Sequence, residues 1–215
     1  MVPPPDANRQ PALRDASIIR HYRGGYKLCY NFPMLLPLQT DRLVLRDFVE
    51  GDFEAFHATT NDPEYGQFYA VRETTRSFWW EVFARIRAGI SAEPRLVYQL
   101  AITLPAGDLI GTCGVRSEDA ENGQASFGCA IARPYWGHGY AYEASRAILD
   151  AGFSTLRLHR IYAETISENA RARALAERLG MRLEGELRER KFFRDRWWHI
   201  AIYAVLAHEW AEGRE

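Results

Sequence analysis

One short segment, which joins a strand-like run to a helix-like run, constrains this chain more than any other. The apolar residues 127–131 are typical of a buried strand, and a helical pattern begins at Tyr140 after the turn Gly137-His138-Gly139. Glycine permits the positive φ angles and the close backbone approach that such a turn needs. The first turn of the helix has free backbone N–H groups and the positive end of the helix dipole. The segment is therefore predicted to bind an anion such as phosphate or pyrophosphate.

Two common phosphate motifs do not fit this segment. No Lys-Ser/Thr pair follows the second glycine, as a P-loop requires. A dinucleotide-binding fingerprint has a third glycine and follows the first strand of its domain, whereas this turn comes late in the chain. The alternative for the Gly-x-Gly pattern alone is a tight turn that binds nothing.

The turn and its surroundings resemble the coenzyme A pyrophosphate loop of the GNAT N-acetyltransferases. That family's pattern is Gln/Arg-x-x-Gly-x-Gly/Ala; Gly139 and Ala141 hold its last two places, and Trp136 stands where Gln or Arg is usual. The form Trp-Gly-x-Gly-Tyr-Ala-x-Glu-Ala is similar to the ribosomal-protein alanine N-acetyltransferase branch. Further similarities follow in the expected order between about Pro37 and Trp210: residues 38–46, residues 161–164 with Asn169, residues 177–181, residues 184–185 and an aromatic closing hairpin.

Composition sets the broad class of the protein. A chain of 215 residues, 47% hydrophobic and 26% charged, is typical of one globular domain. The net charge of −1 gives no basic field for nucleic acid. No segment has the pattern of a signal peptide or of a membrane span. The three cysteines form no Cys-x-x-Cys pair, so we expect a cytoplasmic protein with reduced thiols, no metal and no membrane partner.

The chain divides into two parts of different character. Residues 1–36 are interrupted by Pro and Gly and are expected to form an N-terminal extension, possibly irregular, while residues 37–215 form the acetyltransferase domain. Met34 leaves open whether the upstream segment is a real extension or whether Met34 is the true initiator.

The regular part predicts an α/β fold. Strands are expected at 43–45, 96–103, 109–115, 125–132, 161–165, 183–193 and 196–206. Helices are expected after Asp52, from Thr75 to Gly89, after Gly139, and over 170–179. The strand–turn–helix–strand unit at 127–165 implies a parallel pair with a right-handed crossover, and the hairpins around it imply antiparallel neighbours. We therefore expect one mixed, mostly antiparallel sheet with helices on both faces; the resemblance implies that its central parallel strands are splayed.

The resemblance implies that acetyl-CoA is the co-substrate. The backbone at residues 137–141 would hold the pyrophosphate, and Ile131 and Arg133 would pair with the pantetheine arm as an added strand does. A strand bulge at 129–131 is expected to free an N–H toward the thioester oxygen. Asn169 has an amide suited to pantetheine, or it is a helix N-cap, or both. The complete predicted cofactor set is Ile131, Arg133, Trp136, Gly137, His138, Gly139, Tyr140, Ala141 and Asn169.

Acetyl transfer also needs a base, because an alkyl ammonium has a pKa of about 10. The candidates are Glu164, Glu184 and Glu189, with Glu186 beside them; each is alternatively a solvated surface carboxylate. Glu164 is the first choice, because strand alternation and partial burial would aim it at the splay and raise its pKa. The acid is harder to assign, because Ala172 and Leu175 occupy places where relatives often have Ser and Tyr.

Two functions compete at this point. The first is an acetyl-CoA-dependent N-acetyltransferase whose acceptor is a protein N-terminus or a small-molecule amine. The second is a catalytically weakened coenzyme A-binding protein that acts as a sensor or scaffold. The sequence leaves the identity of the acceptor and a homodimer open.

Overall fold

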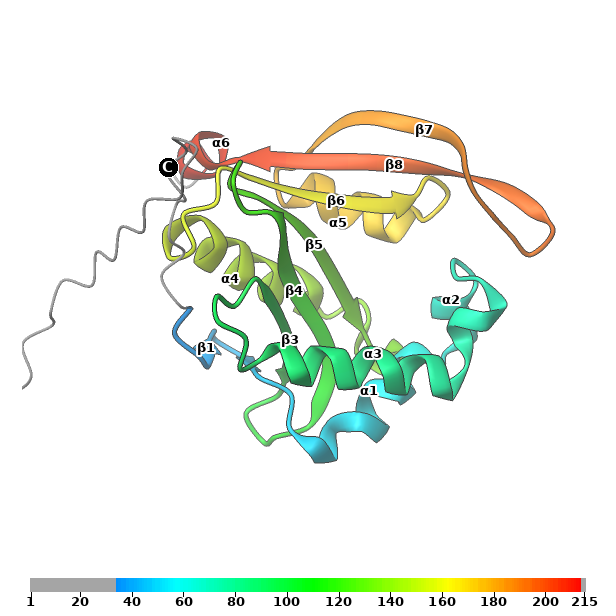
Figure 1. Ribbon diagram of the computed structural model, residues 1–215, viewed down its shortest axis with the longest axis horizontal. Helices are drawn as coiled ribbons and strands as arrows, with labels where there is room; N and C mark the ends of the chain where they lie inside the picture. The colour runs from blue at the N-terminus through cyan, green and yellow to red at the C-terminus, as the bar shows by residue number, and fades with distance from the viewer. Residues whose placement is uncertain (1–33, 214–215) are drawn as a thin grey trace, which may run out of the picture.

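One eight-stranded sheet organises the fold, with strand order β1-β2-β3-β4-β5-β6-β8-β7, in the computed structural model, which describes residues 34–213 (Figure 1). Its strands are β1 (Leu38–Gln39), β2 (Val44–Arg46), β3 (Val97–Thr103), β4 (Leu109–Asp119), β5 (Gln124–Ile131), β6 (Arg160–Ile166), β7 (Arg182–Phe193) and β8 (Arg196–Leu206). Neighbouring strands are antiparallel except for the central pair β5–β6. The predicted mixed, mostly antiparallel sheet is confirmed.

Helices cover both faces of this sheet. They are α1 (Phe53–Thr60), α2 (Pro63–Gly66), α3 (Arg76–Gly89), α4 (Tyr140–Ser154), α5 (Ala170–Arg178) and α6 (Ala207–Glu212), with 3-10 turns η1 (Glu50–Asp52), η2 (Val71–Thr74) and η3 (Arg133–Tyr135). Leu100 and Ile102 of β3 pack in the cluster that contains α4, whereas Ala101 between them packs with α1 and α3. Since successive strand residues point to opposite faces, α4 lies on one face and α1 and α3 on the other.

The central parallel pair separates after three residue pairs. Its register runs from Gln124↔Arg160 to Ser126↔Tyr162, although β5 continues to Ile131 and β6 to Ile166. Beyond Ser126, the edge of β5 that faces β6 therefore has no strand partner. This is the predicted splay.

Local signals explain where most elements begin and end. The Thr75 hydroxyl accepts a hydrogen bond from the N–H of Phe78 and caps α3, as predicted. The β7–β8 hairpin turns at Arg194 and Asp195, both with positive φ (50° and 56°), which suits a two-residue turn. Asp52 precedes α1 but does not cap it, because its carboxylate accepts from the N–H of Val49 and pairs with Arg46.

The hydrophobic core reaches the first described residue. Met34 is only 6% exposed, belongs to the same cluster as Leu43 and Leu100, and donates its backbone N–H to the Tyr98 hydroxyl at 3.2 Å. Core packing thus begins a little before Pro37, where the regular pattern of the sequence starts. The expected extension, residues 1–33, lies outside the described residues.

Candidate active site

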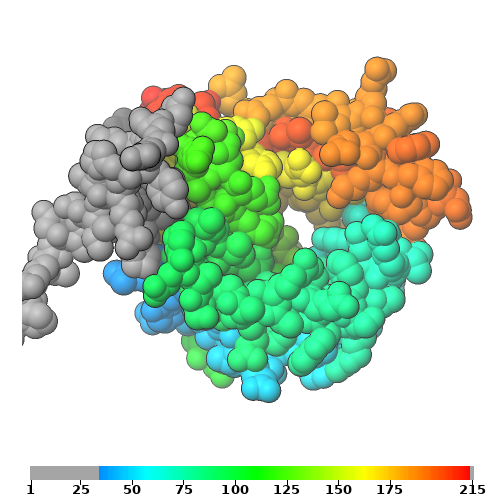
Figure 2. All heavy atoms as spheres, in the orientation of Figure 1, coloured from blue at the N-terminus to red at the C-terminus, as the bar shows by residue number. Residues whose placement is uncertain are grey.

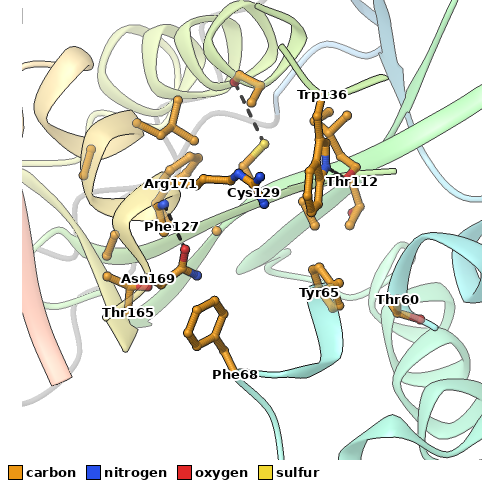
Figure 3. A pocket seen from close by; sticks show the side chains of 18 of the residues that line it. Thr60, Tyr65, Phe68, Thr112, Phe127, Cys129, Trp136, Thr165, Asn169 and Arg171 are labelled. Atoms are coloured by element: carbon orange, nitrogen blue, oxygen red, sulfur yellow. Dashed lines mark hydrogen bonds between the residues drawn. The ribbon is translucent and has the colours of Figure 1, made fainter. Parts of the chain in front are cut away.

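A cavity of about 1120 Å³ occupies the splay between β5 and β6. Residues 127–131 of β5, residues 163–165 of β6 and one side of α5 form its inner walls, and α1, α2 and α3 close it from the other side (Figure 3). The space-filling view shows this hollow between the yellow segment that includes β6 and the teal segment of α2 and α3 (Figure 2). The fold thus opens its sheet at one place and surrounds the gap with helices.

The Gly-x-Gly turn lies at one end of this cavity and directly precedes α4. Gly137 and Gly139 have φ of 79° and 82°, the left-handed region that favours glycine. Gly139 is the N-cap residue of α4 and has no side chain to cap it. Among residues 34–213 no protein acceptor is recorded for the backbone N–H groups of residues 140–142. The turn thus leads into a helix N-terminus with free donors, which is the arrangement that an anion site needs.

Glu143, in the first turn of α4, helps to hold the Gly-x-Gly turn in place. Its carboxylate accepts hydrogen bonds from the Thr40 hydroxyl at 2.6 Å and from the Arg42 backbone N–H at 2.9 Å, and it forms an ion pair with the Arg42 guanidinium. Arg42 also donates to the His138 carbonyl at 3.1 Å. Burial opposes ionisation of Glu143, but these hydrogen bonds outweigh it and lower the pKa of its carboxyl. Glu143 thus ties the start of the sheet to the turn.

Trp136, which stands where the family pattern has Gln or Arg, makes two contacts of its own. Its indole N–H donates to the Ile131 carbonyl at 2.5 Å, and the Arg171 guanidinium stacks on its ring at 4.3 Å. The ring therefore links the end of β5 to the first turn of α5. An aromatic side chain is suited to this role because it offers a flat face to the cation and a single donor to the strand.

Asn169 acts as a helix cap and also faces the cavity. Its side-chain oxygen accepts the N–H of Ala172 at 3.1 Å, which caps α5. Among residues 34–213 no acceptor is recorded for its side-chain NH₂, and the residue lines the cavity (Figure 3). The amide can therefore hold the helix with its oxygen and bind a ligand carbonyl with its nitrogen.

The structure brings most of the predicted cofactor residues to the cavity, but not all of them. Those that line it are Ile131, Trp136, Gly137, Gly139, Tyr140, Ala141 and Asn169. His138 is outside the lining; its Nδ1 lies 2.8 Å from the Trp136 carbonyl, and its ring stacks on Tyr140. Arg133 lies in η3, just beyond the end of β5, and is outside the lining.

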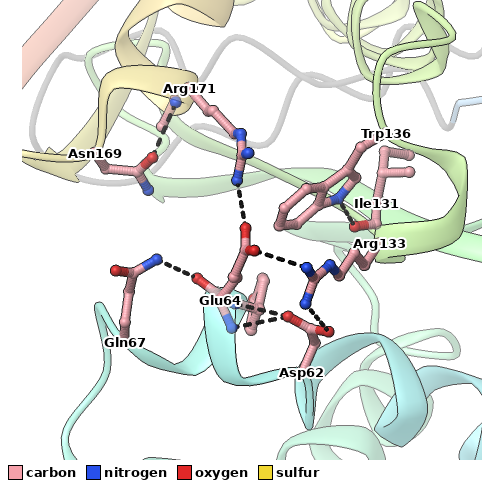
Figure 4. Close-up of polar contacts among 10 residues, drawn as sticks. Asp62, Glu64, Gln67, Ile131, Arg133, Trp136, Asn169 and Arg171 are labelled. Atoms are coloured by element: carbon pink, nitrogen blue, oxygen red, sulfur yellow. Dashed lines mark hydrogen bonds and ion pairs between the residues drawn. The ribbon is translucent and has the colours of Figure 1, made fainter.

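Arg133 instead joins an ion network at the mouth of the cavity (Figure 4). Its guanidinium pairs with Asp62 at 3.7 Å and with Glu64 at 2.9 Å. Arg171 pairs with the other oxygen of Glu64 at 2.9 Å. The carboxylates of Asp62, the N-cap residue of α2, and of Glu64 within α2 thus connect the segment after β5 to α5. Sequence reasoning missed this network, because its members are far apart in the chain.

The predicted catalytic carboxylates are not gathered in one place. Glu164 on β6 lines the cavity, but its side chain is exposed, so the expected partial burial is wrong. Glu184 lies outside the lining and pairs with Arg160. Glu189 is exposed, with φ of 52°, and its backbone N–H donates to Nδ1 of His199 at 2.8 Å. Only Glu164 of the three borders the splay.

The pairing of β4 with β5 tests whether β5 has the expected bulge. The register of β4 with β5 is continuous from Gly111↔Ile131 to Arg116↔Ser126, so the bulge expected at 129–131 is absent there. The register shift lies instead between Arg116 and Asp119.

No group of His, Cys, Asp or Glu residues suited to a metal ion occurs among residues 34–213.

Two tyrosines supply hydroxyl groups that the sequence did not point to. Tyr65 and Tyr69 line the cavity, stack at 5.0 Å, and have hydroxyls 3.0 Å apart. Burial raises the pKa of the Tyr65 hydroxyl well above its ordinary value, with further contributions from Tyr69 and Cys129. Both hydroxyls are therefore neutral donors at physiological pH. Tyr65 lies within α2, a helix of only four residues, which is too short for a helical period to show in the sequence.

The sequence matches the acetyltransferase (GNAT) domain family over residues 42–182. It is 30% identical over 174 residues to the uncharacterized N-acetyltransferase p20 of Bacillus licheniformis, covering 81% of this chain and 98% of that protein. It is 27% identical over 175 residues to the spermidine N(1)-acetyltransferase of Vibrio cholerae, covering 81% and 98%. The fold matches Mycobacterium smegmatis RimJ in complex with CoA-disulfide with a TM-score of 0.66 at 22% identity, covering 80% of this chain and 89% of that one.

Within residues 34–213 no helix is both long and apolar enough to cross a membrane.

Proposed function

The chain belongs to the GNAT acetyltransferase family and is an acyltransferase, and from this premise we propose that it transfers the acetyl group of acetyl-CoA to a primary amine. The acceptor is a small-molecule amine or a protein N-terminus. One observation carries the proposal: a cavity that begins at a helix N-terminus with free N–H groups and continues along an unpaired strand edge. Relatives named for spermidine acetylation support an amine as the acceptor.

The residues present fit the co-substrate. The free N–H groups at residues 140–142 would bind the pyrophosphate. The open edge of β5 up to Ile131 would pair with the amides of the pantetheine arm, and the Asn169 NH₂ would donate to one of its carbonyls. Acetyl-CoA supplies the thioester from which the acetyl group is taken. The residues of the chain would hold the thioester in one orientation relative to the acceptor amine.

Glu164 is the base in this proposal. It is the predicted carboxylate that lines the cavity, and it borders the splay from the β6 side. Its carboxylate would take the proton of the acceptor ammonium, directly or through water. Tyr65 would donate a hydrogen bond to the leaving sulfur, because its buried hydroxyl stays protonated. This places a donor in the site although Ala172 and Leu175 have none.

The proposal is tested by acetyl-CoA turnover. Free thiol released from acetyl-CoA is measured with and without a panel of amines and short peptides, and the acetylated products are identified by mass. Amine-dependent thiol release with a matching acetylated product is the expected result. Tight binding of acetyl-CoA without amine-dependent release would contradict the proposal and favour a coenzyme A-binding sensor.

A further inference from the structure

The strongest unexplained feature of the cavity is the side chain of Arg116. Arg116 lies on β4 opposite Ser126, at the last register pair before β5 and β6 separate. Its guanidinium lies over Gly128: a Cβ atom built on that glycine would be 3.1 Å from an Arg116 terminal nitrogen. Arg116 lines both the main cavity and a smaller adjoining one of about 280 Å³. A half-buried cation thus stands where the sheet opens.

The polar partners of this cation are neutral. One terminal nitrogen of Arg116 donates to the Gln99 side-chain oxygen at 2.6 Å, and Nε donates to the Ser126 hydroxyl at 3.3 Å. In the part of the chain that the structure describes, Arg116 forms no ion pair with a carboxylate. Two other poorly exposed arginines, Arg46 on β2 and Arg95 just before β3, each hold an aspartate with two hydrogen bonds.

The carboxylate of Glu118 attracts the Arg116 guanidinium electrostatically, but its oxygens accept hydrogen bonds from other groups. Glu118 accepts from the Ser126 hydroxyl at 2.9 Å and from the Tyr162 hydroxyl at 2.7 Å, one on each oxygen. Desolvation lowers the pKa of Arg116, which is the direction expected when a cation is buried with incomplete compensation. The remaining N–H groups of a guanidinium in this state match a carboxylate, which can accept two of them at once.

The residues around Arg116 could bind the other parts of a ligand that carries a carboxylate. Glu164 lines the same two cavities and offers a carboxylate to an ammonium group. The opposite wall consists of aromatic rings on or near α2 and α3, contributed by Tyr65, Phe68, Tyr69 and Trp79. Arg116, Glu164 and an aromatic wall therefore border one space beside the splay. The main cavity is also lined by Arg171, Arg178 and Glu64, of which Arg171 and Glu64 pair with each other, and the smaller one by Glu118 and Lys191.

We propose that the acceptor is a free amino acid with a large apolar side chain. Arg116 binds its carboxylate, Glu164 faces its amine, and the aromatic wall receives its side chain. The inference rests on the proposed acetyl transfer and specifies its substrate class. A polyamine would bring a cation against Arg116, and a peptide N-terminus has no free carboxylate next to its amine. Either would leave the guanidinium without an ionic partner, which is costly in a buried site.

The first test compares three amines that share one side chain: phenylalanine, phenylalaninamide and phenethylamine, with spermidine as a polycationic comparison. Each is assayed by thiol release from acetyl-CoA. Phenylalanine should have a kcat/KM at least about 10²-fold above that of each analogue without a carboxylate, because a site built for a polar group strongly rejects analogues that lack it.

The second test uses substitutions of the arginine itself. Arg116→Gln should remove most of the preference for phenylalanine over phenethylamine, mainly through KM, while Arg116→Lys should keep part of it. Thermal melts and acetyl-CoA affinity of each variant establish that it is folded. Equal kcat/KM for phenylalanine and phenethylamine, or an unchanged preference in Arg116→Gln, would overturn the inference but leave acetyl transfer standing. Absence of thiol release with every amine would overturn both.

Discussion

Replacing Gly139 by valine separates the binding role of the anion loop from its role in folding. Gly139 has φ of 82°, and an ideal Cβ atom there meets only an Arg42 nitrogen within 4 Å, at 3.5 Å. The new side chain would therefore enter space that the protein itself leaves open beside the free N–H groups of α4. Any phosphate bound to those groups would collide with it.

The expected magnitudes follow from these two effects. A side chain in the left-handed region costs about 1–2 kcal/mol, which for a domain of this size lowers Tm by about 2–8 °C. The loss of one charge-assisted hydrogen bond to a phosphate costs about 1.5–3 kcal/mol. That cost corresponds to a fall in acetyl-CoA affinity of about 10- to 150-fold for each bond lost. The affinity effect should therefore far exceed what the melting temperature suggests.

The matched control is Gly180→Val. Gly180 has φ of 77°, close to that of Gly139, and has no atom within 4 Å of its ideal Cβ. It ends α5 and does not line the cavity. Both variants should lose a similar amount of stability in thermal melts, but only Gly139→Val should lose affinity in calorimetry with acetyl-CoA. A folded Gly139→Val that binds acetyl-CoA as tightly as the parent would refute the placement of the pyrophosphate.

Three further predictions use other parts of the molecule. A chain that starts at Met34 should keep its Tm and acetyl-CoA affinity, since Met34 is the first described residue of the core; a clear loss in a melt or titration would show that residues 1–33 support the domain. Glu143→Gln should lower Tm at pH 7, because the carboxyl has a lowered pKa in the folded state; this difference should fade as the pH falls below about 4, the ordinary glutamate pKa, and through the lower folded value, and a difference that persists in acid would contradict it. Glu164→Gln should lower kcat by about 10²-fold or more with acetyl-CoA affinity retained; parent-like turnover across the pH range would make Glu164 structural and move the search to Glu184, Glu186 and Glu189.

Elements with strong local signals were predictable from the sequence. Residues 196–206 form β8 as expected, and Thr75 caps α3, because a turn or a cap is decided by a few adjacent residues. The Gly-x-Gly turn belongs to the same class, since its two glycines are separated by a single residue. By contrast α2 has only four residues, too few to show a helical period.

Features that depend on which side chains meet across the fold were not predictable. Glu64 is separated from Arg171 by 107 positions, and no local pattern connects them. The position of the bulge was wrong because a register shift needs only one extra residue, and it occurs between Arg116 and Asp119 rather than at 129–131. The predicted partial burial of Glu164 was wrong because strand alternation shows which face of the sheet a side chain is on, but not how well other elements cover that face.

The two halves of the proposed site, one for the cofactor and one for the acceptor, therefore differ in how the sequence encodes them. The cofactor half consists largely of backbone: the free N–H groups at the start of α4 and the open edge of β5. Backbone geometry leaves a trace in sequence only where glycine is obligatory, as at Gly139. The acceptor half consists of side chains on β4, β6, α2 and α3, and its charge is set by single residues such as Arg116. An acetyl-CoA site can thus be recognised from a short motif, whereas the acceptor depends on side chains that the motif does not contain. The amine named for a relative consequently carries less weight for this chain than the guanidinium of Arg116 in its own cavity, which forms no ion pair within residues 34–213.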